Sequence, residues 1–332
     1  MQLTDFDYAL PPELIAHHPA QPRDHSRLMI VNRKAQTIAH DHFYNLSKYL
    51  TSSDTLVFNK TKVFPARLFA RKTTGGRVEI LLIRYDTASW EYISHPGIKE
   101  GTYLAFADQV TAQVVKGKLI FNLSYADLMA KLLIIGHVPL PPYIHPQEEW
   151  DETKLRRMYQ TVYAAEIGSV AAPTAGFHFT KKLLSKLGKT GIQKEFVILH
   201  VGLGTFQPVK TANILDHQMH SEYYALDPQV AQRLMAAKSA GKKMVAVGTT
   251  VVRTLETWAN AGQLSGETNI FIYPGYKFKF VGALITNFHL PKSTLLMLVS
   301  AFAGRDLVIV AYQEAIKEKY RFYSFGDAML IL

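Results

Sequence analysis

The sequence predicts a mixed α/β protein whose main domain is interrupted by a small antiparallel β-barrel domain. Apolar runs of the buried-strand type alternate with helical stretches near both ends of the chain, which is typical of an α/β domain. The middle of the chain instead has short strand-like runs separated by tight turns, with almost no helical period. We therefore expect residues 1–60 and 151–332 to form the main domain, which carries the active site, and residues 61–150 to form the barrel.

The first predicted elements are a buried strand at 55–59 and then the strands of the barrel. Residues 63–71 and 77–83 flank Thr73-Thr74-Gly75-Gly76, which is the signature of a β-hairpin. Glycine and proline separate the strand-like runs that follow, which are 90–93, 103–106, 110–115 and 119–123. The proline-rich segment 139–144 marks the return to the main domain.

Strands and helices alternate again after the barrel. Leucines three and four apart predict a helix over 181–188, with Thr180 as its N-cap. Further helices are expected at 227–240, 250–261 and 305–321, and further strands at 196–201, 244–247 and 283–287. Polar residues and glycines gather where these strands end, and ligands bind at such ends in α/β folds.

Composition limits the class of protein. The chain has 332 residues, of which 48% are hydrophobic and 19% charged, as in ordinary folded proteins. No apolar run approaches the roughly 20 residues of a membrane span, and the N-terminus lacks a signal-peptide pattern, so we expect a cytoplasmic protein without membrane contact. The absence of cysteine excludes disulfides, thiolate nucleophiles, iron–sulfur clusters and cysteine zinc sites.

The net charge of +10 is uneven along the chain. Residues 151–332 carry 21 basic and 13 acidic side chains. A basic excess favours polyanionic partners such as nucleic acid, although a solvated basic surface is the commoner explanation of any single lysine cluster.

Three loops place a histidine where a ligand could approach the backbone. Loop 169–180 is rich in small residues and brings His178 to a helix N-terminus, where free N–H groups are available. Residues 200–208 carry His200 and a Gly-x-Gly, for which turn geometry is as good an explanation as ligand binding. Segment 286–297 contains His289 and is dense in polar groups that need partners.

Two further segments have more than one interpretation. His217, His220 and Glu222 suit a metal site, a hydrogen-bonded acid–base pair or a structural role. Gly248-Thr249-Thr250 leads from a strand into a helix that carries Arg253, so it suits either the binding of a carboxylate or phosphate or simple N-capping by a threonine.

Together these segments resemble one family, the S-adenosylmethionine:tRNA ribosyltransferase-isomerases of queuosine biosynthesis. The resemblance runs nearly end to end, in long motifs that occur in the same order. The matching motifs include 26–28, 65–68, 141–144, 159–163, 171–179, 200–206, 219–222, 248–250, 286–297, 301–304 and 321–329.

The resemblance implies that the ribosyl part of S-adenosylmethionine is transferred to 7-aminomethyl-7-deazaguanine at the wobble position of a tRNA. The product is epoxyqueuosine-tRNA, and adenine and methionine are released. S-adenosylmethionine is then a cosubstrate, and no metal or redox cofactor is implied. We expect a monomer whose partners are tRNA and S-adenosylmethionine.

The resemblance also implies which residues form the site. Acid–base roles are expected for His178, His220 and Glu222, with His200 and His289 as second choices. The residues expected to hold the cosubstrate are Gly176, Phe177, Gly204, Thr205, Gly248, Thr249, Thr250 and Arg253. The residues expected to contact RNA are Lys62, Arg67, Arg71, Lys72, Lys292 and Arg321.

The sequence departs from the family pattern at Asn59-Lys60-Thr61-Lys62-Val63, where an aspartate and an arginine are usual at the two lysine positions. The change adds positive charge near Arg67, which favours an RNA-facing or structural position over a catalytic one. The rival hypotheses are an S-adenosylmethionine-dependent RNA methyltransferase, a non-catalytic RNA-binding protein and a metal-dependent hydrolase. The first sixty residues lack the glycine-rich loop that the methyltransferase needs.

Overall fold

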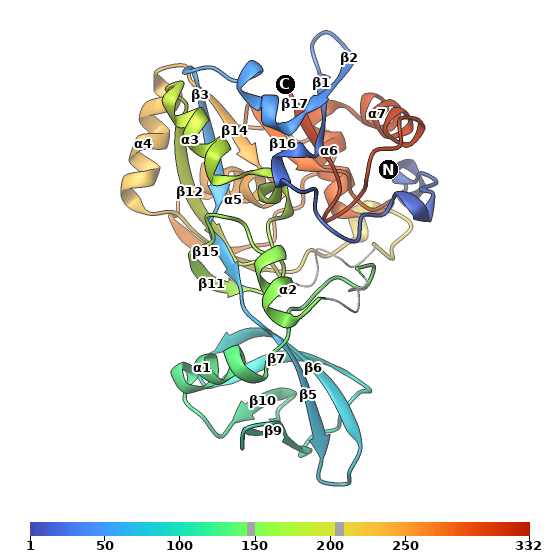
Figure 1. The fold of residues 1–332 in the computed structure, drawn as a ribbon, viewed down its shortest axis with the longest axis vertical. Helices are drawn as coiled ribbons and strands as arrows, with labels where there is room; N and C mark the ends of the chain where they lie inside the picture. Colours follow the sequence, from blue (N-terminus) through green and yellow to red (C-terminus); the bar gives the residue numbers. More distant parts are fainter. Residues whose placement is uncertain (145–149, 203–208) are drawn as a thin grey trace.

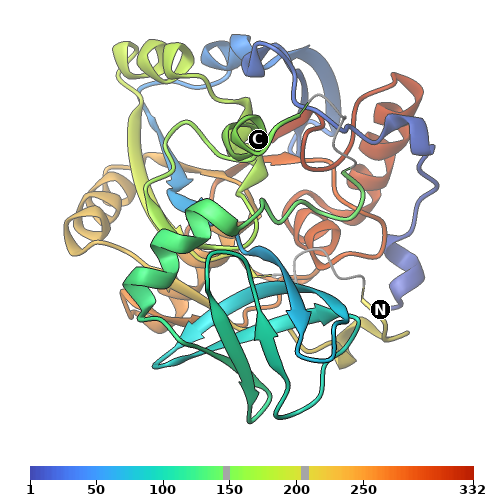
Figure 2. The same ribbon diagram turned by 60° about the horizontal axis from the view of Figure 1, so that its bottom comes forward.

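The computed structural model describes residues 1–144, 150–202 and 209–332. Figure 1 shows a large α/β lobe that contains both termini and a smaller β-barrel below it. Figure 2 brings the barrel to the front and shows that it packs against one end of the large lobe. The fold class expected from the sequence is confirmed by the presence of both parts.

The large lobe is built on a sheet that contains nine strands among the described residues. Their order is β15-β13-β12-β3-β14-β16-β17-β1-β2, and the inner strands β12, β3, β14 and β16 are parallel. Their bounds are β1 Arg27–Asn32, β2 Thr37–His42, β3 Asp54–Asn59, β12 Gln193–Leu199, β13 Glu222–Ala225, β14 Lys243–Val247, β15 Ser265–Thr268, β16 Ala283–Asn287 and β17 Ala328–Ile331. The carboxyl ends of the four parallel strands therefore lie along one edge of the sheet.

Helices cover both faces of this sheet, which explains why β3, β14 and β16 are almost continuously buried. Helices α4 (Pro228–Ser239), α5 (Thr249–Ala261), α6 (Thr294–Ala303) and α7 (Arg305–Lys317) pack on the face that includes Val57. Helix α3 (Lys181–Lys189) and the 3-10 helix η4 (Phe43–Lys48) pack on the face that includes Leu56 and Phe58. Because side chains alternate between the faces of a strand, residues 56–58 of β3 are divided between two cores.

The barrel is closed, with strand order β10-β7-β6-β5-β8-β9. Its bounds are β5 Arg67–Lys72, β6 Arg77–Asp86, β7 Ser89–His95, β8 Tyr103–Ala105, β9 Thr111–Val115 and β10 Lys118–Phe121. The predicted hairpin is confirmed, because Arg71 pairs with Arg77 across the turn and the Lys72 N–H donates to the Gly76 carbonyl. All of these strands fall inside the expected insert, 61–150.

Two helices lie in segments where no helix was expected from the sequence. Helix α1 (Tyr125–Ile135) buries Leu128 and Leu132 against the barrel interior, and Ser124 caps it. Helix α2 (Glu152–Met158) follows on the return path. The connection is completed by β4 (Thr61–Val63), which pairs in parallel with β11 (Glu166–Ser169). Nearly all positions of α1 are apolar, so no amphipathic period stands out, and α2 is too short to show one.

No single described helix is both long and apolar enough to cross a membrane. Helices α6 and α7 pass the test of length and composition only as a pair, and the chain bends by 113° between them.

Candidate active site

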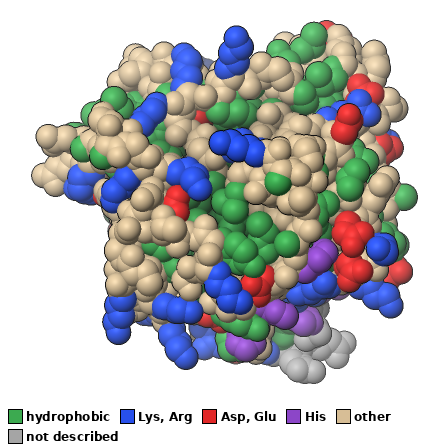
Figure 3. Space-filling model, turned by 90° about the horizontal axis from the view of Figure 1, so that it is seen from above, with side chains coloured by type: hydrophobic (Ala, Val, Ile, Leu, Met, Phe, Trp, Pro, Cys, Tyr) green, Lys and Arg blue, Asp and Glu red, His purple; other side chains and the backbone are tan. Residues whose placement is uncertain are grey.

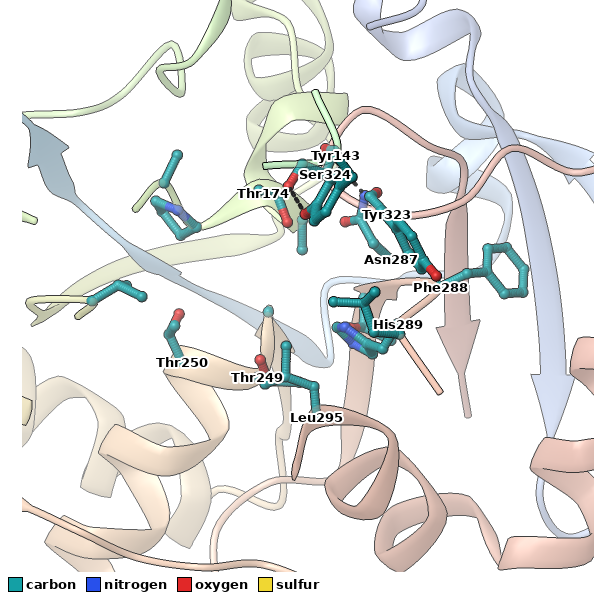
Figure 4. Close-up of a pocket in the computed structure, with 17 residues that line it drawn as sticks. Tyr143, Thr174, Thr249, Thr250, Asn287, Phe288, His289, Leu295, Tyr323 and Ser324 are labelled. Carbon is teal, nitrogen blue, oxygen red and sulfur yellow. Dashed lines mark hydrogen bonds between the residues drawn. The ribbon is translucent and has the colours of Figure 1, made fainter. Parts of the chain in front are cut away.

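A pocket opens where β14 and β16 end, beside the first turn of α5 (Figure 4). Its polar lining comes from five segments that are distant in sequence. These polar residues are Tyr143, Thr174, Thr249, Thr250, Thr286, Asn287, His289, Tyr323 and Ser324. Apolar residues such as Ala172, Val201 and Leu295 complete the walls. Among the described residues that line it, His289 is the only histidine, and none is a carboxylate.

The backbone turn at Gly248 places the first turn of α5 on the pocket. Gly248 has φ +96°, a conformation that residues with a Cβ rarely adopt, and it is the N-cap residue of the helix. The interpretation of Thr249 or Thr250 as an N-cap is therefore wrong, because no side chain caps this helix. The Thr250 hydroxyl is buried without a hydrogen-bond partner. A buried polar atom of this kind, next to the free N–H groups of a helix start, indicates a place for an anionic or hydroxyl group.

His289 is held from both sides. Its Nε2 atom lies 2.7 Å from the Thr286 hydroxyl, and its backbone N–H donates to the Tyr312 hydroxyl at 2.9 Å. The Tyr8 hydroxyl donates to the His289 carbonyl. Burial lowers the pKa of the His289 imidazole to about 3, so the ring is neutral at physiological pH. A neutral imidazole in a fixed orientation can accept a proton from a ligand in the pocket.

His178 lies behind the pocket rather than in it. It is buried, its Nδ1 is 2.7 Å from the Ser26 hydroxyl, and its Nε2 is 3.4 Å from Oδ1 of Asn287. The Asn287 amide donates to the Tyr323 carbonyl, so its oxygen faces His178 and Nε2 carries the proton. Burial is the main cause that lowers the pKa of His178 to about 4. His178 thus positions Asn287, which lines the pocket.

Glu222 and Arg253 form a buried ion pair. Glu222 also accepts from the Gly202 N–H at 2.8 Å, and an Arg253 N–H reaches the Thr268 carbonyl at 3.4 Å. Both side chains line a small neighbouring hollow that also includes His217 and the exposed His220. The Arg253 guanidinium is therefore paired with Glu222, and the Glu222 carboxylate is occupied by Arg253 and Gly202. No group of three His, Asp or Glu side chains among the described residues could hold a metal ion.

A larger hollow of about 500 Å³ lies between the barrel and the main lobe. Val201 lines both this hollow and the pocket beside α5, so the two adjoin. His200 lines the hollow, with Nδ1 2.9 Å from the Thr61 hydroxyl and its ring stacked on Tyr223. Gly168 packs so closely against this imidazole that a Cβ there would overlap it. Burial lowers the pKa of His200.

The remaining predicted cosubstrate residues lie away from the pocket or outside the described residues. A Cβ on Gly176 would overlap the Tyr163 hydroxyl, so close packing explains this glycine. Phe177 is buried and stacks on Phe325 with ring centroids 5.7 Å apart. Neither residue lines the pocket. Gly204 and Thr205 lie outside the described residues.

Several of the predicted RNA-contacting side chains have carboxylate partners. Lys292 pairs with Asp7 at 2.8 Å and Arg321 with Asp327 at 3.2 Å. Arg67 pairs with Glu79. Lys62 is exposed, as is Arg71, while Lys72 is partly exposed, and no ion pair engages any of the three within the described chain. Lys60, at the other unusual position, pairs with Glu166 at 3.3 Å.

Sequence reasoning did not single out Tyr143, Thr174, Tyr323 and Ser324. The Tyr143 hydroxyl lies 2.7 Å from that of Ser324, across the pocket wall (Figure 4). Tyr143 belongs to the matching motif 141–144 and Ser324 to the matching motif 321–329. Only their meeting in space assigns them to the pocket.

We predict that acid destabilises the fold through the buried His178. The pKa of His178 is about 4 in the folded chain, against 6.5 ordinarily, so the unfolded chain binds the proton more readily. The contribution of neutral His178 to the free energy of unfolding is complete above pH 6.5 and is lost as the pH falls towards 4. The loss reaches about 2 kcal/mol at pH 5. Urea unfolding at pH 7.5 and pH 5 measures this loss. His178→Gln should show a smaller loss by that amount, and an identical pH dependence in both proteins would contradict the assignment.

The chain is similar over its full length to proteins of one family. The profile of a family described as queuosine biosynthesis protein matches residues 3–331. The S-adenosylmethionine:tRNA ribosyltransferase-isomerases of Carboxydothermus hydrogenoformans and Thermotoga maritima are 51% and 50% identical to the chain, and each match covers 100% of both proteins. A crystal structure of the S-adenosylmethionine tRNA ribosyltransferase of T. maritima matches with a TM-score of 0.59 and 40% identity, over 99% of this chain and 100% of that one.

Proposed function

The chain belongs to the queuosine biosynthesis protein family, and we propose that it is an S-adenosylmethionine:tRNA ribosyltransferase-isomerase. It transfers and isomerises the ribosyl part of S-adenosylmethionine onto 7-aminomethyl-7-deazaguanine at the tRNA wobble position. The products are epoxyqueuosine-tRNA, adenine and methionine. This proposal is carried by sequence identity of 50–51%, over the full length, to enzymes of that name. It is supported by a pocket that contains a neutral imidazole.

The first step of the reaction removes a proton from the 5′ CH₂ group, which the adjacent sulfonium acidifies. A base must therefore lie within reach of that group. His289 is the group in the pocket that can take this proton, since its imidazole is neutral and oriented by Thr286. Loss of the proton lets adenine leave. The amine of the modified base then adds to the unsaturated sulfonium, the carbon chain recloses, and an alkoxide displaces methionine to form the epoxide.

The first turn of α5 is the place for an anionic or hydroxyl group of the cosubstrate. Thr249 and Thr250 lie there with free N–H groups, and the Thr250 hydroxyl lacks a partner within the protein. We assign the methionine carboxylate to this turn rather than to Arg253, whose charge is balanced by Glu222. The enclosed pocket is only about 60 Å³, smaller than typical ligand sites of about 300–1,000 Å³, so binding has to displace part of its lining.

The hollow between the lobes suits the extruded wobble base. Its wall carries an aromatic cluster in which Tyr85 and Tyr125 have ring centroids 4.6 Å apart and Trp90 stacks on Tyr125. Bases flipped out of an RNA loop are commonly held by stacking on such rings. Because Val201 separates this hollow from the pocket beside α5, the base and the cosubstrate would meet there. Acting on tRNA, the enzyme works in the cytoplasm, and we propose that it does so as a monomer.

Product analysis tests the proposed function. The full-length protein is incubated with S-adenosylmethionine and a tRNA that carries 7-aminomethyl-7-deazaguanine. Adenine and methionine should appear in equal amounts, together with epoxyqueuosine in the digested tRNA. The matched control is the same tRNA with unmodified guanine, which should release no adenine. Formation of S-adenosylhomocysteine would show methyl transfer instead, and no product at all would favour a non-catalytic RNA-binding protein.

A further inference from the structure

The outer surface of the barrel carries a second feature that the catalytic site does not use. Phe69, Arg71, Arg77 and His95, which we call the barrel face, help to line a hollow of about 640 Å³ on strands β5, β6 and β7. Arg71 lies directly opposite Arg77 in the β5–β6 pair, so both side chains are on the same side of the sheet. No described residue lines both this hollow and the pocket beside α5.

The two arginines of the barrel face are not neutralised by the protein. Like charges directly opposite each other destabilise a β-sheet pair. Within the described chain no carboxylate pairs with either guanidinium, whereas Glu79, which also lines this hollow, is held by both Nε and Nη2 of Arg67. The stretch Arg67–Arg77 contains four basic residues and no acidic residue. An anionic ligand between Arg71 and Arg77 would remove this repulsion.

The aromatic member of the barrel face is unusually open. Phe69 is 54% exposed, although it occupies the middle of a strand. Its ring is flanked by the Arg67 guanidinium, 5.5 Å from the ring centroid, and by the edge of the His137 ring. An exposed ring beside cationic groups suits a planar partner that is attached to negative charge.

We propose that the barrel face is a second RNA site, where Arg71 and Arg77 bind phosphates and a nucleobase stacks on Phe69. That the RNA is the tRNA substrate rests on the proposed function, but the binding itself does not. Bases joined to phosphates combine the two features that the face presents, and proteins that bind single strands use the same combination of a basic groove and aromatic rings. At the opposite end of the molecule, lysines and arginines are dispersed among apolar and acidic side chains (Figure 3).

Salt-dependent binding of an unmodified tRNA transcript to the full-length protein tests this site. Each phosphate contact contributes about 0.7–0.9 to the slope of log affinity against log salt, so Arg71→Ala/Arg77→Ala should lower that slope by about 1.4–1.8. Phe69→Ala should weaken binding about tenfold with the slope unchanged, because stacking is not an ionic contact. The matched control is Lys189→Ala/Lys242→Ala, which removes two charges where α3 ends and where β14 begins, away from the carboxyl edge of the sheet.

The outcomes separate this inference from the proposed function. If both the arginine pair and Phe69 variants bind tRNA with the affinity and slope of the wild type, the barrel face is not an RNA site, even when the wild type releases adenine. If the wild type releases no adenine but the variants lose RNA affinity, the proposed function fails and the RNA site stands. Urea unfolding checks that the variants fold, and replacing the two facing arginines together should not lower stability, because their mutual repulsion is removed. Equal losses in the control variant would mean that charge alone, not this face, governs binding.

Discussion

Replacing His289 by glutamine should lower the rate of adenine release by about 10²–10⁴-fold, the usual contribution of a positioned acid–base group. Glutamine can still hydrogen-bond to Thr286 but cannot accept a proton at neutral pH. The measurement is a single-turnover assay with saturating S-adenosylmethionine and modified tRNA, so that neither binding nor product release limits the rate. Adenine release at the wild-type rate would remove His289 from the proton-transfer step.

His178→Gln provides the contrast, because His178 reaches the pocket only through Asn287. Its replacement should act by misplacing the Asn287 amide. His178→Gln and Asn287→Ala should therefore not be additive: the double variant should be no slower than Asn287→Ala alone. A residue that itself transfers the proton would instead add its own loss. A larger effect for His178→Gln than for His289→Gln would restore the sequence-based choice of His178 as the acid–base residue.

The fold was largely predictable because its signals are local. Residues 56–58, 244–247 and 283–285 are apolar throughout, which is the pattern of a strand covered on both faces. The Thr73–Gly76 turn between two apolar runs specified the first hairpin of the barrel. Thr180 caps α3 as expected, since the N-cap preference depends on neighbouring residues alone.

The site was less predictable because side-chain partners are chosen across the whole fold. Histidine in the 169–180 loop has the same local signal whether it lines a pocket or lies behind one, and the contacts with Ser26 and Asn287 decide which. Gly176 is small because Tyr163 packs against it, not because a ligand does. A motif therefore indicates that a residue matters, whereas only the packing around it shows what it does.

Glu222 and Arg253 illustrate the same point with the largest expected effect on stability. Each residue is 6% exposed, and each is the other's charge partner. Replacing one leaves an uncompensated buried charge, so Arg253→Met should lower the free energy of unfolding by about 3–5 kcal/mol. Glu222→Gln should cost a similar amount, because the guanidinium of Arg253 then lacks a counter-ion.

The double variant Glu222→Gln/Arg253→Met distinguishes a structural pair from a catalytic one. With both charges removed, stability should recover most of the loss, since no unpaired charge is left in the core. Urea unfolding of the two single variants and the double variant closes the cycle. Asp108→Asn is the matched control, because Asp108 pairs with Lys131 at the surface and should cost no more than about 1 kcal/mol. If instead the single variants were as stable as the wild type and only adenine release fell, Glu222 would be acting on the substrate rather than on Arg253.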